Sequence, residues 1–154
     1  MRRAAAALLL ALAAAVTAAG CADRPAPRLA PAAAATPAPL SVQVVDTDSI
    51  GRVLADLDGH TLYFDDQERG GSVLCLGGCT AARPPLLHPP GEPLRLPTGL
   101  AGTLSLVTRP DGQHQLAYDA HPLYTFTGDK QPGDVNGGGQ HWHPVQPANA
   151  NGSH

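Results

Sequence analysis

Short runs in which apolar and polar residues alternate are the main pattern of the chain from residue 41 onward. Alternation over about four to six residues predicts β-strands, because successive side chains of a strand point to opposite faces. Glycine and proline interrupt the pattern so often that no segment reaches the roughly ten residues that an amphipathic helix needs. The predicted strands cover residues 41–45, 52–56, 61–65, 103–108, 114–119, 122–126 and 142–146. We therefore expect a small all-β domain with antiparallel strands.

Turn residues predict how some of these strands are joined. The Asp-Gly pair at 58–59 predicts one β-hairpin and the Pro-Asp-Gly run at 110–112 predicts another, because these residues favour the backbone angles of tight turns. The stretch 79–100 is rich in proline, and we expect it to form a long loop or crossover.

The pattern occurs twice, with a shift of 61 residues. Each copy consists of a strand, a tight turn at Asp58 or Asp119, and a second strand that carries Leu-Tyr. The matching pairs are Gly51 with Gly112, Asp58 with Asp119, His60 with His121, Leu62 with Leu123, Tyr63 with Tyr124, and Glu68 with Asp129. The copies, at about residues 51–85 and 112–145, predict a duplicated β-hairpin unit whose apolar faces bury each other.

The segment before the domain has the build of an export signal. Residues 1–20 place Arg2 and Arg3 before an apolar run, and small residues then lead to Cys21. The run is too short and too rich in alanine for a membrane span of about 20 apolar residues. The ending "AAGC" resembles the bacterial lipobox, in which the cysteine receives a diacylglycerol thioether and becomes the mature N-terminus. An ordinary signal-peptidase site near Ala19 is the alternative.

Composition then divides the rest of the chain. Residues 21–40 are rich in proline and alanine after Cys21 and predict a disordered or polyproline-like tether. Residues 41–147 form the predicted domain, and 148–154 a disordered tail. The protein is then expected in the cell envelope, anchored by lipid at the periplasmic or extracellular face of a bacterial membrane.

The charge of the domain excludes one class of partner. Between residues 41 and 147, six lysine or arginine residues stand against twelve aspartate or glutamate residues, a formal net charge of −6. Nucleic acid is repelled by such a surface, because affinity for it rests on phosphate neutralisation.

Several motifs together resemble a known family. "YTFTGD", with Tyr124, Phe126 and Asp129, fits the Y-x-(F/W/Y)-x-x-D motif of bacterial envelope lipoproteins described as secreted repeats of unknown function. "LCLGGC", "PPLL", "RPDG", "GDVNGGG" and "HWHPV" match the same family in order. The resemblance spans about residues 51–145 and implies an envelope location without implying an activity.

The first copy departs from the family pattern. Asp65 stands where an aromatic residue is expected, Glu68 replaces the motif's aspartate, and Arg83 takes a position usually held by tryptophan. We therefore expect thinner aromatic packing in the first copy.

The two tyrosines of the repeat are interpreted as structural anchors. Tyr63 and Tyr124 each follow a leucine on a strand, which is typical of a buried ring whose hydroxyl finds a partner. The acid five residues later, Glu68 or Asp129, is the expected acceptor or the cap of the following turn. A ligand-binding role for the tyrosines is the alternative.

Cys75 and Cys79 carry the sharpest local signal for chemistry. Gly77 and Gly78 between them allow a tight backbone turn, and in an exported protein a disulfide is the default. The alternative is a redox or copper(I) site, because soft thiolates select that metal.

Other candidate ligands are weaker. His141 and His143 share one face of a predicted strand and could meet one metal ion, although a polar strand face is the favoured interpretation. Asp129, Asp134 and Asn136 lack the regular spacing of a calcium loop.

Enzyme signatures are absent from the sequence. We therefore expect a non-enzymatic binding or structural module without a cofactor, whose protein or small-molecule partner the sequence does not name. A periplasmic redox or copper-handling module that uses Cys75 and Cys79 is the second hypothesis.

Overall fold

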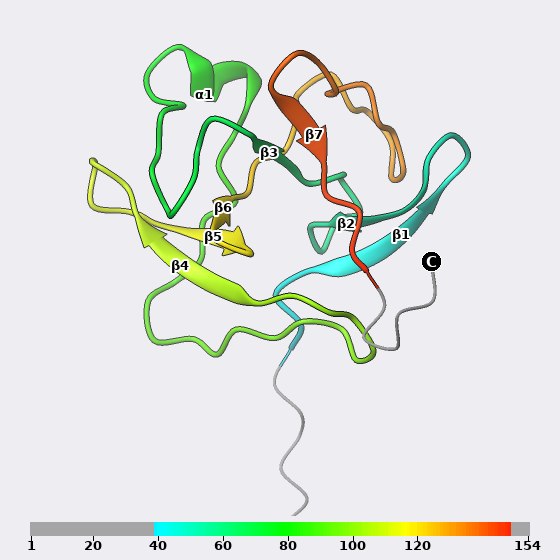
Figure 1. Cartoon of the computed structure of the whole chain (residues 1–154), viewed down its shortest axis with the longest axis horizontal. Coiled ribbons are helices and arrows are strands. Elements are labelled where there is room, and N and C mark those ends of the chain that lie inside the picture. Colours follow the sequence, from blue (N-terminus) through cyan, green and yellow to red (C-terminus); the bar gives the residue numbers. More distant parts are fainter. Residues whose placement is uncertain (1–38, 149–154) are drawn as a thin grey trace, which may run out of the picture. The chain divides into compact units, whose positions relative to one another are not determined.

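β-Strands carry almost all the regular structure of residues 39–148, which the computed structural model describes (Figure 1). The predicted signal peptide, Cys21, nearly all of the tether and the tail after residue 148 lie outside the described residues. Within them, no helix is long and apolar enough to cross a membrane.

The strands form three small antiparallel sheets, which confirms the predicted fold class. The sheets have the orders β1-β2, β3-β7 and β4-β5-β6. The bounds are β1 Gln43–Thr47, β2 Gly51–Ala55, β3 Tyr63–Asp65, β4 Leu104–Thr108, β5 His114–Tyr118, β6 His121–Pro122 and β7 Trp142–Pro144. A single helical turn, α1 (Cys79–Ala82), lies at the start of the predicted crossover.

The predicted turns close hairpins as expected. Asp56 N donates to His60 O at 2.9 Å, around Gly59 with φ 95°. A Cβ at Gly59 would lie 2.8 Å from a carbon of Pro132, so this turn needs glycine for its backbone angle and its space. In the second copy, Asp119 and Ala120 both have positive φ and join β5 to β6.

The structural repeat begins earlier than the matching residues indicate. β1 and β4 start at Gln43 and Leu104, which keeps the 61-residue shift, and each pairs with the strand that follows it. Both strands lie before the predicted limits of 51–85 and 112–145. Both strands were predicted, but the predicted repeat left them out because QVVDT and LSLVT share only a general apolar character.

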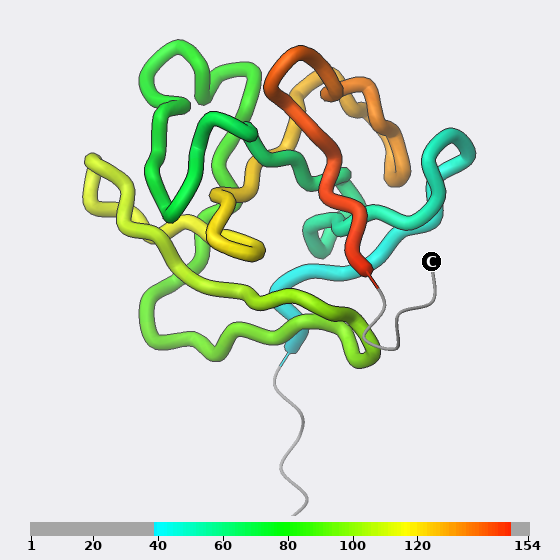
Figure 2. Tube along the Cα trace, in the orientation of Figure 1, coloured from blue at the N-terminus to red at the C-terminus, as the bar shows by residue number. Residues whose placement is uncertain are grey.

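The end of the second copy crosses to the hairpin of the first. Val145 N donates to Leu62 O, Leu62 N donates to Leu54 O, and Leu54 N donates to Val145 O, each at 2.8 Å. Figure 2 shows the orange-red trace of β7 running beside the green segment of β3, with which it pairs.

The end of the first copy makes the equivalent crossing. Leu86 N donates to Leu123 O at 2.9 Å, and Leu123 N donates to Leu116 O at 2.8 Å. Leu116 N donates back to Leu86 O, also at 2.8 Å. The two copies are therefore interlocked, because each hairpin is completed by a segment from the other copy.

The two copies meet at their repeated tyrosines. Tyr63 N donates to Tyr124 O at 2.8 Å, and Tyr124 N donates to Tyr63 O at 2.9 Å. Tyr124 also forms a β-bridge with Pro85. Of the predicted strand 122–126, Pro122 lies in β6 and Tyr124 forms isolated bridges with single residues of separate segments.

Both copies contribute to one hydrophobic core. Its fully buried members are Val42, Leu54, Leu62, Leu116, Leu123 and Val145. Leucines of the crossover, including Leu86 and Leu96, pack against this cluster. The apolar faces of the two copies thus bury each other, as the repeat predicts.

Candidate functional site

The tyrosines and acids of the repeat form two buried pairs between the copies. Tyr63 Oη donates to Asp129 Oδ2 at 2.8 Å, and Tyr124 Oη donates to Glu68 Oε1 at 2.9 Å. The acid five residues later was expected to accept from the tyrosine of its own copy or to cap the following turn. The first role is wrong, because the interlocked chain places each acid beside the tyrosine of the other copy.

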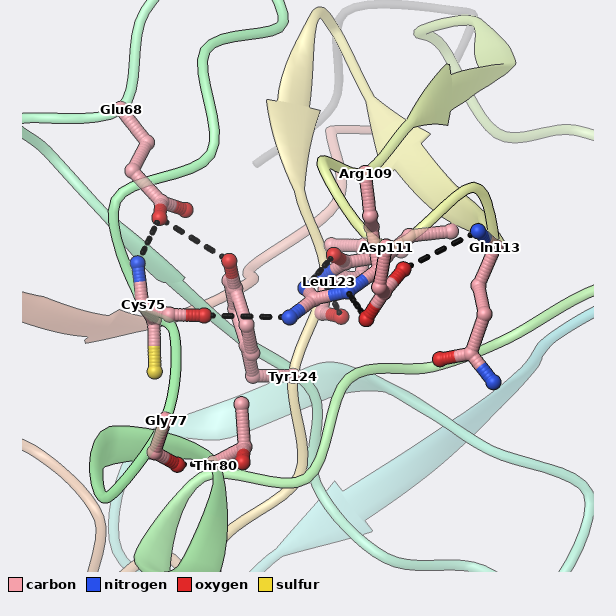
Figure 3. A network of polar contacts seen from close by, with 10 residues as sticks. Glu68, Cys75, Gly77, Thr80, Arg109, Asp111, Gln113, Leu123 and Tyr124 are labelled. Carbon is pink, nitrogen blue, oxygen red and sulfur yellow. Dashed lines mark hydrogen bonds and ion pairs between the residues drawn. The ribbon is translucent and has the colours of Figure 1, made fainter.

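Glu68 also holds the loop that contains Cys75 and Cys79, called the cysteine loop below. Its Oε1 accepts hydrogen bonds from the backbone N–H groups of Leu74 and Cys75 (Figure 3). The side chain is fully buried, and Oε2 has no hydrogen-bond partner within the described residues. The carboxylate of Glu68 therefore serves the backbone of its own copy and the tyrosine of the other.

Asp129 does the same for the glycine-rich loop of the second copy. Its Oδ1 accepts from Asn136 N at 2.9 Å and from Asn136 Nδ2 at 3.2 Å. Gly137 N donates to Tyr63 Oη at 3.0 Å, and a Cβ at Gly137 would lie 2.6 Å from the Tyr63 ring. The glycine is thus needed where the loop closes over the tyrosine.

Burial and the paired acids together raise the pKa of both tyrosine hydroxyls. Burial is the larger cause for Tyr63, followed by its hydrogen bond to Asp129. For Tyr124, burial is followed by the negative charge of Glu68. Both hydroxyls therefore stay protonated at neutral pH and act as hydrogen-bond donors.

Arg83 lies among aromatic rings where the two copies meet. Its guanidinium carbon lies 4.3 Å from the centre of the Phe126 ring and 4.5 Å from that of Trp142. Pro85 bridges to Tyr124 as Pro144 pairs with Tyr63. Arg83 and Trp142 each stand two residues before one of these prolines, so they hold equivalent positions in the two copies. A cation–π stack with Trp142 thus stands where the resemblance predicts a tryptophan at position 83.

The aromatic packing around Tyr63 of the first copy is supplied by the second copy. Phe126, of the second copy, packs edge-on against Tyr63 of the first, with ring centres 6.5 Å apart. Asp65 is the equivalent of Phe126 in the first copy, so the missing ring at Asp65 does not remove the ring that packs against Tyr63. Tyr124 instead packs against Trp142, with ring centres 5.1 Å apart.

A disulfide joins Cys75 and Cys79, whose Cα atoms lie 5.3 Å apart. The pairing favoured from the sequence is therefore present. Arg109 is buried and donates to the backbone carbonyl of Cys75 at 3.2 Å and to the side chain of Gln115. Gln115 Nε2 in turn donates to Leu123 O at 2.7 Å, which ties the cysteine loop to the second copy.

Sequence reasoning missed the roles of Arg109 and Gln115. In the sequence Arg109 belongs only to the "RPDG" motif, whereas in the fold the residue is 3 % exposed. A buried arginine beside a cysteine loop 34 residues away has no signature in the local pattern.

The two histidines of the C-terminal strand do reach a common partner. His141 Nδ1 lies 3.5 Å from Asp66 Oδ1, and His143 Nε2 lies 3.2 Å from Asp66 Oδ2. The sequence did not indicate Asp66, which comes near only through the pairing of β3 with β7. His60 and His121 contact Asp56 and the backbone of Asp119 respectively, in their own turns.

An open surface pocket of about 520 Å³ lies on the crossover. Leu87, His88, Pro89 and His114 are among the residues that line it, and no carboxylate does. Its largely apolar lining suits contact with an apolar group.

Comparison with known proteins finds one similarity, which lies in the second copy. Residues 105–146 match the model of a lipoprotein family described as a secreted repeat of unknown function. No curated protein and no solved structure matches the chain. The match includes β5, β6, β7 and the loop held by Asp129. Residues 105–146 are therefore similar to the secreted repeats of unknown function.

Proposed function

We propose that the protein is a lipid-anchored, non-enzymatic module of the bacterial cell envelope, which presents a rigid β-domain for binding or structural contact. The burial of the repeated motif residues carries this proposal. Tyr63, Tyr124 and Glu68 are fully buried, and Asp129 is 5 % exposed. A substrate cannot reach groups that are enclosed and already hydrogen-bonded, so the motif supports a scaffold rather than catalysis.

The surface of the domain then carries the function. The crossover pocket with its exposed Leu87 offers an apolar contact area. The net charge of −6 between residues 41 and 147 disfavours nucleic acid and leaves proteins and small molecules as partners.

The lipid anchor rests on the lipobox-like ending at Cys21. A thioether on Cys21 would leave Cys75 and Cys79, which pair with each other, so that no free thiol remains. Such a chain avoids intermolecular crosslinks in an oxidising compartment.

Membrane partition tests the anchor. The exported Cys21→Ser protein is expected to move from the membrane fraction to the aqueous phase of a detergent extraction. The Cys75→Ser/Cys79→Ser protein, which keeps Cys21, should stay with the membrane and serves as the control. A Cys21→Ser protein that sediments with membranes like the wild type would contradict the anchor.

The redox or copper(I) alternative requires two free thiolates. The disulfide between Cys75 and Cys79 favours the structural interpretation, because it consumes both sulfurs. Intact-mass measurement of protein exported to its native compartment decides between them. Alkylation of both cysteines without prior reduction would favour the redox function.

A further inference from the structure

Two histidines and one aspartate meet on one face of the sheet formed by β3 and β7. Asp65 pairs with Trp142 in this sheet, and Asp66 N donates to His141 O at 2.9 Å. Because side chains alternate along a strand, Asp66, His141 and His143 all point away from the face that carries Trp142.

Both imidazoles contact the Asp66 carboxylate in solvent. His141 Nδ1 and His143 Nε2 face the two different oxygens of Asp66, and the three side chains are 40–48 % exposed. Arg69 is the neighbouring cation, and its Nε donates to the backbone carbonyl of Asp66 at 3.0 Å. Both carboxylate oxygens of Asp66 are therefore left to the imidazoles.

Neighbouring groups contact both imidazole rings. The amide nitrogen of Gln67 lies 3.5 Å from His141 Nε2, on the side of that ring away from Asp66. The His143 ring packs against Phe64, with ring centres 5.5 Å apart. A metal at His141 Nδ1 leaves Nε2–H as a donor, which the amide oxygen of Gln67 can accept once the amide is turned.

We propose that Asp66, His141 and His143 bind one divalent transition-metal ion, Cu²⁺ most tightly and Zn²⁺ more weakly. Two imidazoles and a carboxylate suit these ions, and Cu²⁺ stands above Zn²⁺ in the general order of affinities. Small rotations of three exposed side chains replace the imidazole–carboxylate contacts by bonds to the metal. The remaining coordination positions stay open to water.

A second group of donor atoms serves as the comparison. Among the described residues, Asp56, Asp58 and His60 already place three donor atoms within 4.8 Å of one another. Asp56 Oδ1, however, accepts from the backbone N–H groups of Asp58 and His60. These bonds build the turn, so the carboxylate is held by the backbone and is less free to bind a metal.

The position of Trp142 provides the measurement. It is the only tryptophan of the chain and lies between the two proposed histidine ligands. Cu²⁺ added to the full chain, prepared without a polyhistidine tag, should quench the Trp142 fluorescence saturably at a single ion per chain. Electron paramagnetic resonance of the Cu²⁺ complex should show coupling to two imidazole nitrogens. Coupling to fewer than two would overturn the proposal.

Variants locate the site. His141→Ala, His143→Ala and Asp66→Asn should each weaken Cu²⁺ binding by roughly tenfold or more. His60→Ala and His88→Ala, which remove exposed or half-exposed histidines elsewhere, should leave the affinity unchanged. Circular dichroism without metal checks that each variant is folded. Binding that survives in the His141→Ala/His143→Ala protein, or that is lost in His60→Ala, would place the ion elsewhere and refute the site.

Discussion

At the scale of single residues, the motif shared by the two copies is interior architecture. Each buried tyrosine donates to a buried carboxylate, and each carboxylate also accepts from the backbone of its own loop. A buried hydrogen bond to a charged acceptor contributes more to stability than one between neutral groups. The tyrosine hydroxyls therefore matter for stability.

Removing these hydroxyls is expected to destabilise the domain. Tyr63→Phe and Tyr124→Phe should each lower the free energy of unfolding by about 1.5–3 kcal/mol, because a buried carboxylate loses a donor. Tyr118→Phe is the matched control, since Tyr118 Oη donates to the neutral carbonyl of Ala101 and is half-buried. Its cost should be about 0.5–1.5 kcal/mol. Urea unfolding measures the free energy of unfolding of all three variants. Equal costs would contradict a stronger bond to the carboxylates of Asp129 and Glu68 than to the carbonyl of Ala101.

The raised tyrosine pKa values predict loss of stability in alkali. Unfolded tyrosine ionises near pH ~10, whereas burial and the acids keep Tyr63 and Tyr124 protonated in the fold. Stability is thus intact below about pH 10 and falls above it, by up to about 1.4 kcal/mol per pH unit for each tyrosine.

Unfolding curves across this pH range test the linkage. The Tyr63→Phe/Tyr124→Phe protein should show a flatter decline than the wild type, with a remainder from Tyr118, whose pKa burial also raises. An equally steep decline in the double variant would assign the effect to other groups.

At the scale of elements, the cysteine loop is held at one end by more than its disulfide. The Cys75 N–H binds Glu68, and the Cys75 carbonyl binds Arg109. Cys79 begins the short α1, none of whose residues is buried. The disulfide therefore matters most for the part of the loop that ends at α1.

Loss of the disulfide should loosen this part of the loop alone. In Cys75→Ser/Cys79→Ser, amide exchange should accelerate over residues 76–83, while the amides of Leu74 and Cys75 stay protected by Glu68. The global cost should be about 2 kcal/mol or less, because the closed ring is short. Thr80→Ala, which removes only the hydrogen bond to Gly77 O, is the control in the same loop. Accelerated exchange throughout β4 and β5 would show that the disulfide holds the whole domain.

At the scale of the whole molecule, the interlocked copies form one cooperative unit. The matched residues 105–146 contain Leu116 and Leu123 but lack Leu86, which completes their hairpin. The same residues supply Val145 to the hairpin of the first copy. Neither copy has its full set of backbone partners alone.

Separated copies should therefore fail to fold. Residues 101–148 alone should show no cooperative melt, whereas residues 39–148 should melt in one transition. Adding residues 39–100 should restore structure, because the missing crossing segment and Tyr63 return. Circular dichroism and amide chemical-shift dispersion measure both. A cooperative melt of 101–148 alone would show that the crossing contacts are dispensable.

The sequence by itself determined the local features of this protein. Alternation placed the strands, Gly59 and residues 110–112 placed two turns, and the spacing of Cys75 and Cys79 indicated their disulfide. These features depend on neighbours within a few residues, so their signals lie in short stretches of chain.

Only the tertiary structure decided which copy each segment completes. A repeat is equally compatible with pairing inside a copy and pairing between copies, because the matching pairs of residues carry the same or similar side chains. The crossing of Leu86 and Val145 settles this choice. It thereby pairs Tyr63 with Asp129 and brings Asp66 beside His143. The first two residues are separated by 66 positions in the sequence and the second two by 77, so no local pattern encodes either contact.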